Sequence, residues 1–243
     1  MPDAVAVAGG PPVLPRAVAH LLSRDDRDRM ATLHRPLDRA RFATGRALLR
    51  SLAAREVGGP ASAVTLDVRC PECGEPHGRP RLVSPQGSPP VHAGISHAGN
   101  WVLVAVAGAP VGIDVEPCTA TAFAGFDPTA LTAGERDELD AMPPELRADA
   151  RARAWVSKEA VLKLHGVGLR REPSQLHIGL SPEDRVLPDP LGAGGHVALR
   201  FLALDGEHRA ALAVFGTSQP SVSFVAADVL LAAPEGTGRT TTR

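Results

Sequence analysis

Residues 91–116 read VHAGISHAGNWVLVAVAGAPVGIDVE and contain three short apolar segments separated by tight turns. Each segment, at residues 91–96, 101–107 and 111–116, has the length and composition of a strand. The middle segment is apolar throughout, which is typical of a strand in the interior of a sheet. The sequence therefore predicts a small sheet in this part of the chain.

Two long helices are predicted, one on each side of this stretch. Over residues 39–57 apolar side chains recur at near-helical spacing, and Gly58 ends the run. Residues 145–166 form the second helix, which ends at Gly166. Because its second half carries apolar side chains almost all the way round, we expect this helix to be mostly buried.

Two shorter helices are predicted from local signals. Thr132 and Glu135 stand at the spacing of a capping box, so residues 132–142 are predicted to be helical. Residues 23–29 are dense in charge, which favours the exposed face of another helix. Residues 70–90 are rich in Pro and Gly and are predicted to be largely loop.

The remaining strand signals lie outside the central stretch, at residues 64–68, near Ile178, and at residues 196–204, 209–215 and 222–229. A helix combined with a small antiparallel sheet therefore occurs twice, which predicts an α+β fold of two similar halves.

The predicted halves comprise residues 20–116 and residues 117–233. Both ends of the chain are predicted to be flexible, because residues 1–19 are rich in Ala, Gly and Pro and residues 234–243 contain little that could be buried.

The composition excludes several classes of protein. Of the 243 residues, 44% are hydrophobic and 22% are charged, which argues against disorder of the whole chain. A formal net charge of -1 gives no global attraction to nucleic acid or to an anionic membrane. The sequence has no apolar run of roughly 18 residues and no signal-peptide pattern, so we expect a cytoplasmic protein.

The three cysteines, Cys70, Cys73 and Cys118, are too few and odd in number for a disulfide framework. Cys70 and Cys73, with His77 nearby, could supply ligands to zinc, although a structural zinc site usually has four protein ligands. Their role is left open.

The first chemical signal is the pair of acids in residues 111–116. Side chains on a strand alternate between faces, so Gly112, Asp114 and Glu116 point the same way. Two adjacent carboxylates raise each other's pKa unless a cation lies between them, and oxygen ligands favour a hard divalent ion. The alternative is a solvent-facing strand end that carries two acids.

The second chemical signal is WVSKEAVLK at residues 155–163. Glu159 lies about 40° around the helix from Trp155, and Lys163 follows Glu159 at i+4 on the same side. Charges on a buried helix are costly unless they are paired or bind a ligand, which favours a functional segment. An internal ion pair between Glu159 and Lys163 is the alternative.

Two weaker signals are suited to binding an anion. Ser96 and His97 end a strand before a turn whose backbone N–H groups could hold phosphate oxygens, although a lone histidine in a turn is usually a capping or surface residue. The segment Gly78-Arg79-Pro80 places a cation beside a glycine that lets a flat or anionic ligand approach, or it is an ordinary loop.

Three segments, taken in order, resemble the signature of the Sfp-type phosphopantetheinyl transferases: ISHAGNW at residues 95–101, GIDVE at residues 112–116, and WVSKEAVLK at residues 155–163. The loop CPECGEPHGRP at residues 70–80 and the helix FATGRALLR at residues 42–50 are also similar to members of that family. Three motifs in order are far more specific than any one alone.

The resemblance covers roughly residues 20–230 and implies a pseudo-twofold fold of two α+β halves with coenzyme A in the cleft between them. It implies that Asp114, Glu116 and Glu159 hold Mg²⁺, which Mn²⁺ could replace. The implied contacts to coenzyme A are made by Ser96, His97, Lys158 and Lys163 at the phosphates, by Gly78, Arg79 and Pro80 at the adenine end, and by Asp114 at the metal.

For the 3'-phosphate of coenzyme A, the family uses basic residues near the first helix, and Arg29 and Arg41 are the matches in this chain. Relatives often have a further lysine just upstream of Arg29. This chain departs from the family there, because it has Asp26, and Arg24 or Arg27 would compensate.

The implied reaction is attack by a serine of an apo acyl or peptidyl carrier protein on the β-phosphate of coenzyme A, which releases adenosine 3',5'-bisphosphate. Glu159 would accept the serine proton and Lys163 would neutralise phosphate charge. Coenzyme A and carrier proteins are the expected partners of a monomeric enzyme, with no nucleic acid or membrane. Two other functions stay open: a non-catalytic module that binds coenzyme A or carrier proteins, and a metal-dependent nucleotide hydrolase.

Overall fold

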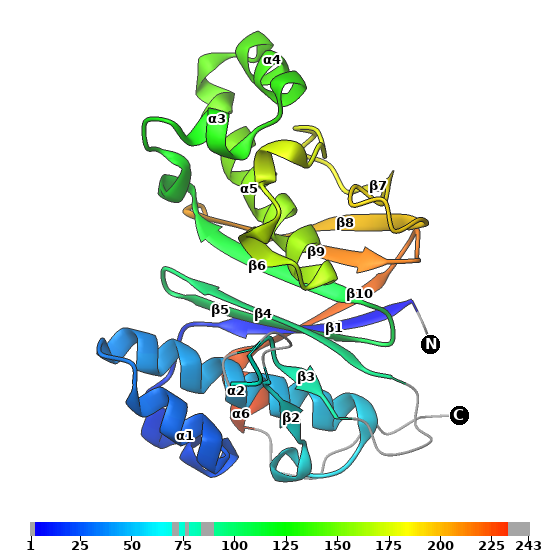
Figure 1. Cartoon of the computed structure of the whole chain (residues 1–243). Helices are drawn as coiled ribbons and strands as arrows, with labels where there is room; N and C mark the ends of the chain where they lie inside the picture. Colours follow the sequence, from blue (N-terminus) through cyan, green and yellow to red (C-terminus); the bar gives the residue numbers. More distant parts are fainter. Residues whose placement is uncertain (1–2, 70–72, 76–77, 84–89, 233–243) are drawn as a thin grey trace. The chain divides into compact units, whose positions relative to one another are not determined.

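The computed structural model describes residues 3–69, 73–75, 78–83 and 90–232. The chain divides into two compact units, each of which combines helices with a four-stranded sheet (Figure 1). Unit 1 consists of residues 1–109 and 221–243, and unit 2 of residues 110–220. The predicted α+β class is confirmed.

The boundaries of the units differ from those of the predicted halves. The strand that begins at Val111 belongs to unit 2, although we assigned it to the N-terminal half. The chain also returns to unit 1 at Ser221, which the prediction of two sequential halves did not include.

The sheet of unit 1 has the strand order β10-β1-β5-β4. Its strands are β1 (Ala4–Gly10), β4 (His92–Ala98), β5 (Trp101–Ala107) and β10 (Ser221–Ala226). Helix α2 (Pro36–Val57) covers one face of this sheet (Figure 1). The predictions for β4, β5 and α2 are confirmed, and β5 lies in the interior of the sheet as its apolar sequence indicated.

Smaller elements complete unit 1. Helices α1 (Arg24–Ala31) and α6 (Ala227–Ala232) pack on α2, and α6 begins where the sequence predicted the end of a strand. The other short elements are the 3-10 helices η1 (Pro15–Leu21) and η2 (Ala61–Ala63) and the two-residue strands β2 (Leu66–Asp67) and β3 (Arg81–Leu82).

The prediction of a flexible N-terminus is wrong for β1, which lies in the interior of the sheet. β1 pairs antiparallel with β5 and parallel with β10, and its Val5 and Val7 are buried. Val5 and Val7 favour a strand, but the other five residues of β1 are Ala and Gly, which have little strand propensity, so its partners elsewhere in the chain determine its structure. The parallel pair also makes this sheet mixed, whereas we expected an antiparallel one. The predicted flexible tail at residues 234–243 lies outside the described residues.

The sheet of unit 2 has the order β6-β9-β8-β7 and is antiparallel throughout. Its strands are β6 (Val111–Pro117), β7 (Arg185–Pro188), β8 (His196–Leu202) and β9 (His208–Phe215). Helix α5 (Pro144–His165) lies across one face, where Val156 and Ala160 pack with Leu199 and Ala213 (Figure 1). As predicted, α5 is buried on most sides.

The second side of α5 is covered by short helices. α3 (Phe126–Ala130) and α4 (Ala133–Ala141) share an apolar cluster with α5, and α4 begins with the predicted capping box. The 3-10 helices are η3 (Cys118–Thr121), η4 (Gly168–Arg170) and η5 (Pro173–Gln175).

The predicted strand near Ile178 is wrong. Ile178 lies in an irregular segment, because its N–H donates to the side chain of Glu135 and not to a neighbouring strand. Within the described ranges, no helix has both the length and the apolar character needed to cross a bilayer.

Candidate active site

The acids of β6 face helix α5. Gly112, Asp114 and Glu116 share one face of β6, and α5 packs on that face so closely that a Cβ at Gly112 would overlap the Ala160 carbonyl oxygen and the Leu164 backbone. Asp114 is only 1% exposed. The solvent-facing strand end that we held as an alternative is therefore excluded for Asp114.

Helix α5 carries a lysine that pairs with an acid of β6. The Lys163 ammonium lies 2.5 Å from Asp114 Oδ1, so it bridges two elements whose residues are far apart in sequence. The electrostatic coupling of Glu159 to both Asp114 and Lys163 places its carboxylate at the same location. The structure thus places Asp114, Glu116, Glu159 and Lys163 in one region of unit 2.

The pKa values of these acids respond to that crowding. Burial first, and then the negative charges of Asp114 and Glu159, raise the pKa of Glu116 to about 7, against the opposing effects of Lys163 and His208. Burial and the charge of Asp114 likewise raise the pKa of Glu159, again against Lys163. Such shifts occur when acids share a site without enough positive charge to compensate them.

A divalent cation would supply the missing charge. Glu159 Oε1 is buried, and no described residue donates a hydrogen bond to it. An orphaned carboxylate oxygen and two acids of raised pKa are a donor set suited to a hard, oxygen-preferring ion. Among the described residues, however, no three Asp, Glu, His or Cys side chains are already grouped closely enough to hold a metal. In this arrangement Asp114 is paired with Lys163.

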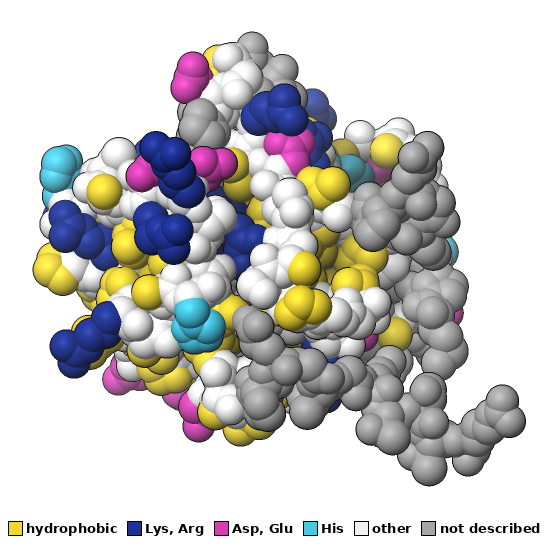
Figure 2. Space-filling view, turned by 90° about the horizontal axis from the view of Figure 1, so that it is seen from below, with side chains coloured by type: hydrophobic (Ala, Val, Ile, Leu, Met, Phe, Trp, Pro, Cys, Tyr) yellow, Lys and Arg dark blue, Asp and Glu magenta, His cyan; other side chains and the backbone are white. Residues whose placement is uncertain are grey.

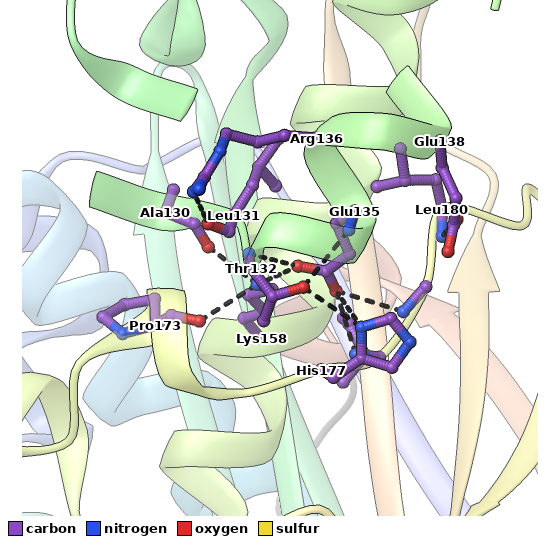
Figure 3. A network of polar contacts seen from close by, with 12 residues as sticks. Ala130, Leu131, Thr132, Glu135, Arg136, Glu138, Lys158, Pro173, His177 and Leu180 are labelled. Atoms are coloured by element: carbon purple, nitrogen blue, oxygen red, sulfur yellow. Dashed lines mark hydrogen bonds and ion pairs between the residues drawn. The ribbon is translucent and has the colours of Figure 1, made fainter. Parts of the chain in front are cut away.

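Lys158 differs from its prediction. We expected it to neutralise phosphate, but its side chain is fully buried and donates to the Ala130 carbonyl (2.7 Å), the Pro173 carbonyl (3.0 Å) and Glu135 Oε2 (2.5 Å), as Figure 3 shows. An ammonium group has three protons, and each is used. Lys158 therefore belongs to the interior of unit 2.

In unit 1, Arg41 is fixed against the turn between β4 and β5. Its guanidinium donates to the Gly99 carbonyl and forms an ion pair with Asp38 at 3.4 Å. His97 is exposed and, by strand alternation, lies on the face of the sheet that α2 covers, whereas Ser96 is buried and points to the other face. The side chains of His97 and Ser96 therefore lie on opposite faces of the sheet.

The Gly78-Arg79-Pro80 loop follows the edge of the same sheet. Arg79 donates to the Ala93 carbonyl of edge strand β4 at 2.7 Å, and the Gly78 N–H donates to the Val68 carbonyl at 2.7 Å. Burial, followed by the charge of Arg81, lowers the pKa of Arg79. The loop presents a cation that is already ordered by the backbone. Cys70 and His77, on which the zinc alternative depends, lie outside the described residues.

Arg29 lies on the exposed side of α1 and donates to Thr32 Oγ1 at 3.3 Å. Figure 2 shows Lys and Arg side chains gathered on the left of its view, the side on which Figure 1 draws α1 and the start of α2. Exposed arginines of this region are Arg24, Arg27, Arg29, Arg35 and Arg39.

Asp26 is a buried structural residue. It is 4% exposed and pairs with Arg50 at 2.7 Å and Arg46 at 3.2 Å. Burial alone would raise the pKa of Asp26, but the two arginines and the Ser23 hydroxyl hold it below its ordinary value. Sequence reasoning missed this cluster, although the i, i+4 spacing of Arg46 and Arg50 places both on one side of α2.

Comparison with known proteins agrees with this geometry. A profile of the 4'-phosphopantetheinyl transferase superfamily matches residues 110–214, the stretch that contains all four residues of the acid and lysine group. A 4'-phosphopantetheinyl transferase of Bacillus subtilis is 30% identical over 200 residues, which are 79% of this chain and 81% of the relative.

Two further relatives are more distant. The 4'-phosphopantetheinyl transferase HetI of Nostoc sp. is 29% identical over 201 residues, 82% of this chain and 81% of the relative. The 4'-phosphopantetheinyl transferase Sfp of Bacillus subtilis is 25% identical over 171 residues, 69% of this chain and 72% of the relative. The resemblance noted from the motifs is thus confirmed, and the chain belongs to the 4'-phosphopantetheinyl transferase superfamily of enzymes.

Proposed function

We propose that the enzyme transfers the 4'-phosphopantetheine group of coenzyme A to a serine of an apo acyl or peptidyl carrier protein in a Mg²⁺-dependent reaction. The observation that carries the proposal is the placement of the β6 acids near Glu159 and Lys163 of α5, with which they interact electrostatically, in a chain that belongs to this family. Phosphoryl transfer needs little more from a protein than positioning and compensation of negative charge.

Asp114, Glu116 and Glu159 would hold the ion, with Mn²⁺ able to replace Mg²⁺. When bound, it would polarise the pyrophosphate of coenzyme A and compensate the charge that develops there. The orphaned Oε1 of Glu159 and the raised pKa of Glu116 support this assignment.

The protein supplies the proton transfer and a second positive charge. The serine oxygen forms a bond to the β-phosphorus, the bond from that phosphorus to the bridging oxygen breaks, and adenosine 3',5'-bisphosphate leaves with the electron pair. The Glu159 carboxylate accepts the serine proton, because it lies at the proposed metal site beside Asp114 and Lys163. Lys163 Nζ compensates phosphate charge from its position beside Asp114.

Further contacts to coenzyme A would come from the basic residues and the loop that the family resemblance indicates. We assign Arg41, His97 and Arg29 to phosphate groups and the Gly78-Arg79-Pro80 loop to the adenine end, because backbone carbonyls order Arg41 and Arg79 while Arg29 and His97 are exposed. Ser96 would contribute through its backbone, since its side chain points to the other face of the sheet. A cytoplasmic monomer, with no nucleic acid or membrane partner, is part of the same proposal.

Mass spectrometry of an apo carrier protein after incubation with the enzyme, coenzyme A and Mg²⁺ tests this function. The expected result is a carrier heavier by one phosphopantetheine group and an equal amount of adenosine 3',5'-bisphosphate, both lost with EDTA. Coenzyme A binding without any mass gain across several carrier types would instead indicate a binding module. Release of the nucleotide without a carrier would indicate a hydrolase.

A further inference from the structure

The residue next to Glu159 anchors several segments of unit 2. We call Lys158, Glu135 and the groups bonded to them the Lys158–Glu135 network (Figure 3). Besides Lys158, Glu135 accepts the N–H groups of Thr132 (2.9 Å), Ile178 (2.9 Å) and Gly179 (3.1 Å). The network therefore joins the middle of α5 to the end of α3, the start of α4 and the segment that follows η5.

Both members of the central ion pair are fully buried, and their polar atoms are satisfied within the described chain. Lys158 and Glu135 have side chains that are 0% exposed, and the two carboxylate oxygens of Glu135 accept four hydrogen bonds. Such a group has one low-energy arrangement, because rotation of either side chain would leave a buried charge without a partner. The network thus fixes the direction in which residue 158 leaves the helix.

Ala160, on the other flank of Glu159, is fixed as well. Its carbonyl oxygen packs so closely against Gly112 of β6 that a side chain at position 112 would overlap it. Consecutive residues of a helix are about 100° apart, so a residue whose two neighbours are held has its own direction set. The direction of Glu159 is therefore constrained by the Lys158–Glu135 network on one side and by the packing of Ala160 against Gly112 on the other.

We propose that Lys158 and Glu135 are positioning residues that set the rotation of α5, and hence the placement of the Glu159 carboxylate against Asp114 and Glu116. The inference deepens the proposed function, on which it rests. It also gives the lysine of the WVSKEAVLK segment a role that requires no contact with coenzyme A.

The test compares Lys158→Met with the double variant Lys158→Met/Glu135→Gln. The single variant leaves Glu135 buried without its cation and should lose thermal stability, whereas the double variant removes both charges and should recover much of it. Mn²⁺ binding to the protein alone, followed by electron paramagnetic resonance, is measured beside steady-state transfer. We expect the double variant to bind Mn²⁺ roughly 10–100-fold more weakly, with a lower kcat and an unchanged KM for the carrier protein.

Asp127→Asn is the matched control. It breaks the Arg151–Asp127 pair (2.6 Å and 2.7 Å), which also ties α5 to α3 but lies two turns from Glu159. It should lower the melting temperature and leave Mn²⁺ binding unchanged. The inference is overturned if the double variant binds Mn²⁺ and turns over like the wild type, or if Asp127→Asn weakens Mn²⁺ binding equally. If the wild type transfers nothing while the double variant still loses Mn²⁺ affinity, the proposed function fails and the positioning role stands.

Discussion

At the scale of single residues, the proposed chemistry depends on how the carboxylate of Glu159 is held. Its Oε1 is buried without a hydrogen-bond donor among the described residues, while burial and Asp114 raise its pKa. A buried carboxylate without a partner lowers the stability of the fold, and binding a cation or a proton would remove that cost. Acids with raised pKa values are common at functional sites, which supports the role proposed for Glu159.

Glu159→Gln should therefore reduce transfer by about 10²–10⁴-fold, because the amide can neither accept the serine proton nor supply a charged ligand. The melting temperature should be unchanged or slightly higher, since an uncompensated buried acid is removed. Steady-state kinetics and thermal melts check both parts. Glu145→Gln, at the start of the same helix, serves as the control. Turnover near that of the wild type would remove Glu159 from the site.

Glu116 should make the effect of Mg²⁺ depend on pH. Its folded-state pKa of about 7 lies above its ordinary value of 4.5, so the folded protein holds more protons than the unfolded one between those values. Stability should therefore fall as pH rises through this range, and a divalent ion that binds the ionised acids should offset the loss.

Thermal melts with and without Mg²⁺ at about pH 6 and about pH 8 measure this linkage. The stabilisation by Mg²⁺ should be larger at the higher pH, and Glu116→Gln should make it smaller and less dependent on pH. An equal effect of Mg²⁺ at both values would show that Glu116 is not titrating at the metal site.

At the scale of elements, the contact between β6 and α5 sets the geometry of the acids. Gly112→Ala should push α5 away from β6, because the new methyl group would overlap the backbone at Ala160 and Leu164. We expect a loss of about 1–3 kcal/mol in the free energy of unfolding, as in overpacked cores, together with weaker Mn²⁺ binding.

Gly134→Ala is the natural comparison for this variant. Gly134 lies in α4, and the nearest atom to a Cβ there is His177 Cε1 at 3.8 Å, so alanine fits and should stabilise by about 0.4–1 kcal/mol. Urea denaturation distinguishes the two. Equal stability of both variants would mean that the β6–α5 contact tolerates a wider spacing than the structure indicates.

Elements with strong local periodicity could be predicted from the sequence, and so could the acids that they carry. Patterns within a few consecutive residues were enough to predict the apolar segments of β5 and β6, the capping box of α4 and the long helix α5. Lys158 could not be assigned in this way. Its partner Glu135 reads locally as a capping residue, and only tertiary packing shows that this acid serves both purposes.

At the scale of the whole molecule, β1 was missed because nothing near it in sequence indicates a sheet. Five of its seven residues are Ala or Gly, and the strand is held by pairing with β5 and with β10. Asp26 could not be assigned for the same reason. Its segment is dense in charge and was predicted to be exposed, but Asp26 pairs with two buried arginines of another helix. Long-range pairing is information that a local pattern does not contain.

The central position of β1 predicts that a charge there is far more damaging than one at a helix end. Val7 is 0% exposed, so Val7→Asp should destabilise by about 3–5 kcal/mol, the usual cost of an unpaired buried charge. Val57, at the end of α2, is 57% exposed, and Val57→Asp should have little effect. Thermal melts compare the two, and a stable Val7→Asp protein would contradict the interior placement of β1.

The pairing of Ala4 with Ser221 also sets an order of events during synthesis. When β1 leaves the ribosome, the strand that must lie beside it has not been translated, and all of unit 2 is made in between. Unit 2 is one continuous stretch, residues 110–220, and can complete its own core first. Unit 1 can close only when β10 emerges, so until then one edge of β1 is an open template for wrong pairing, which makes the nascent chain a client for chaperones.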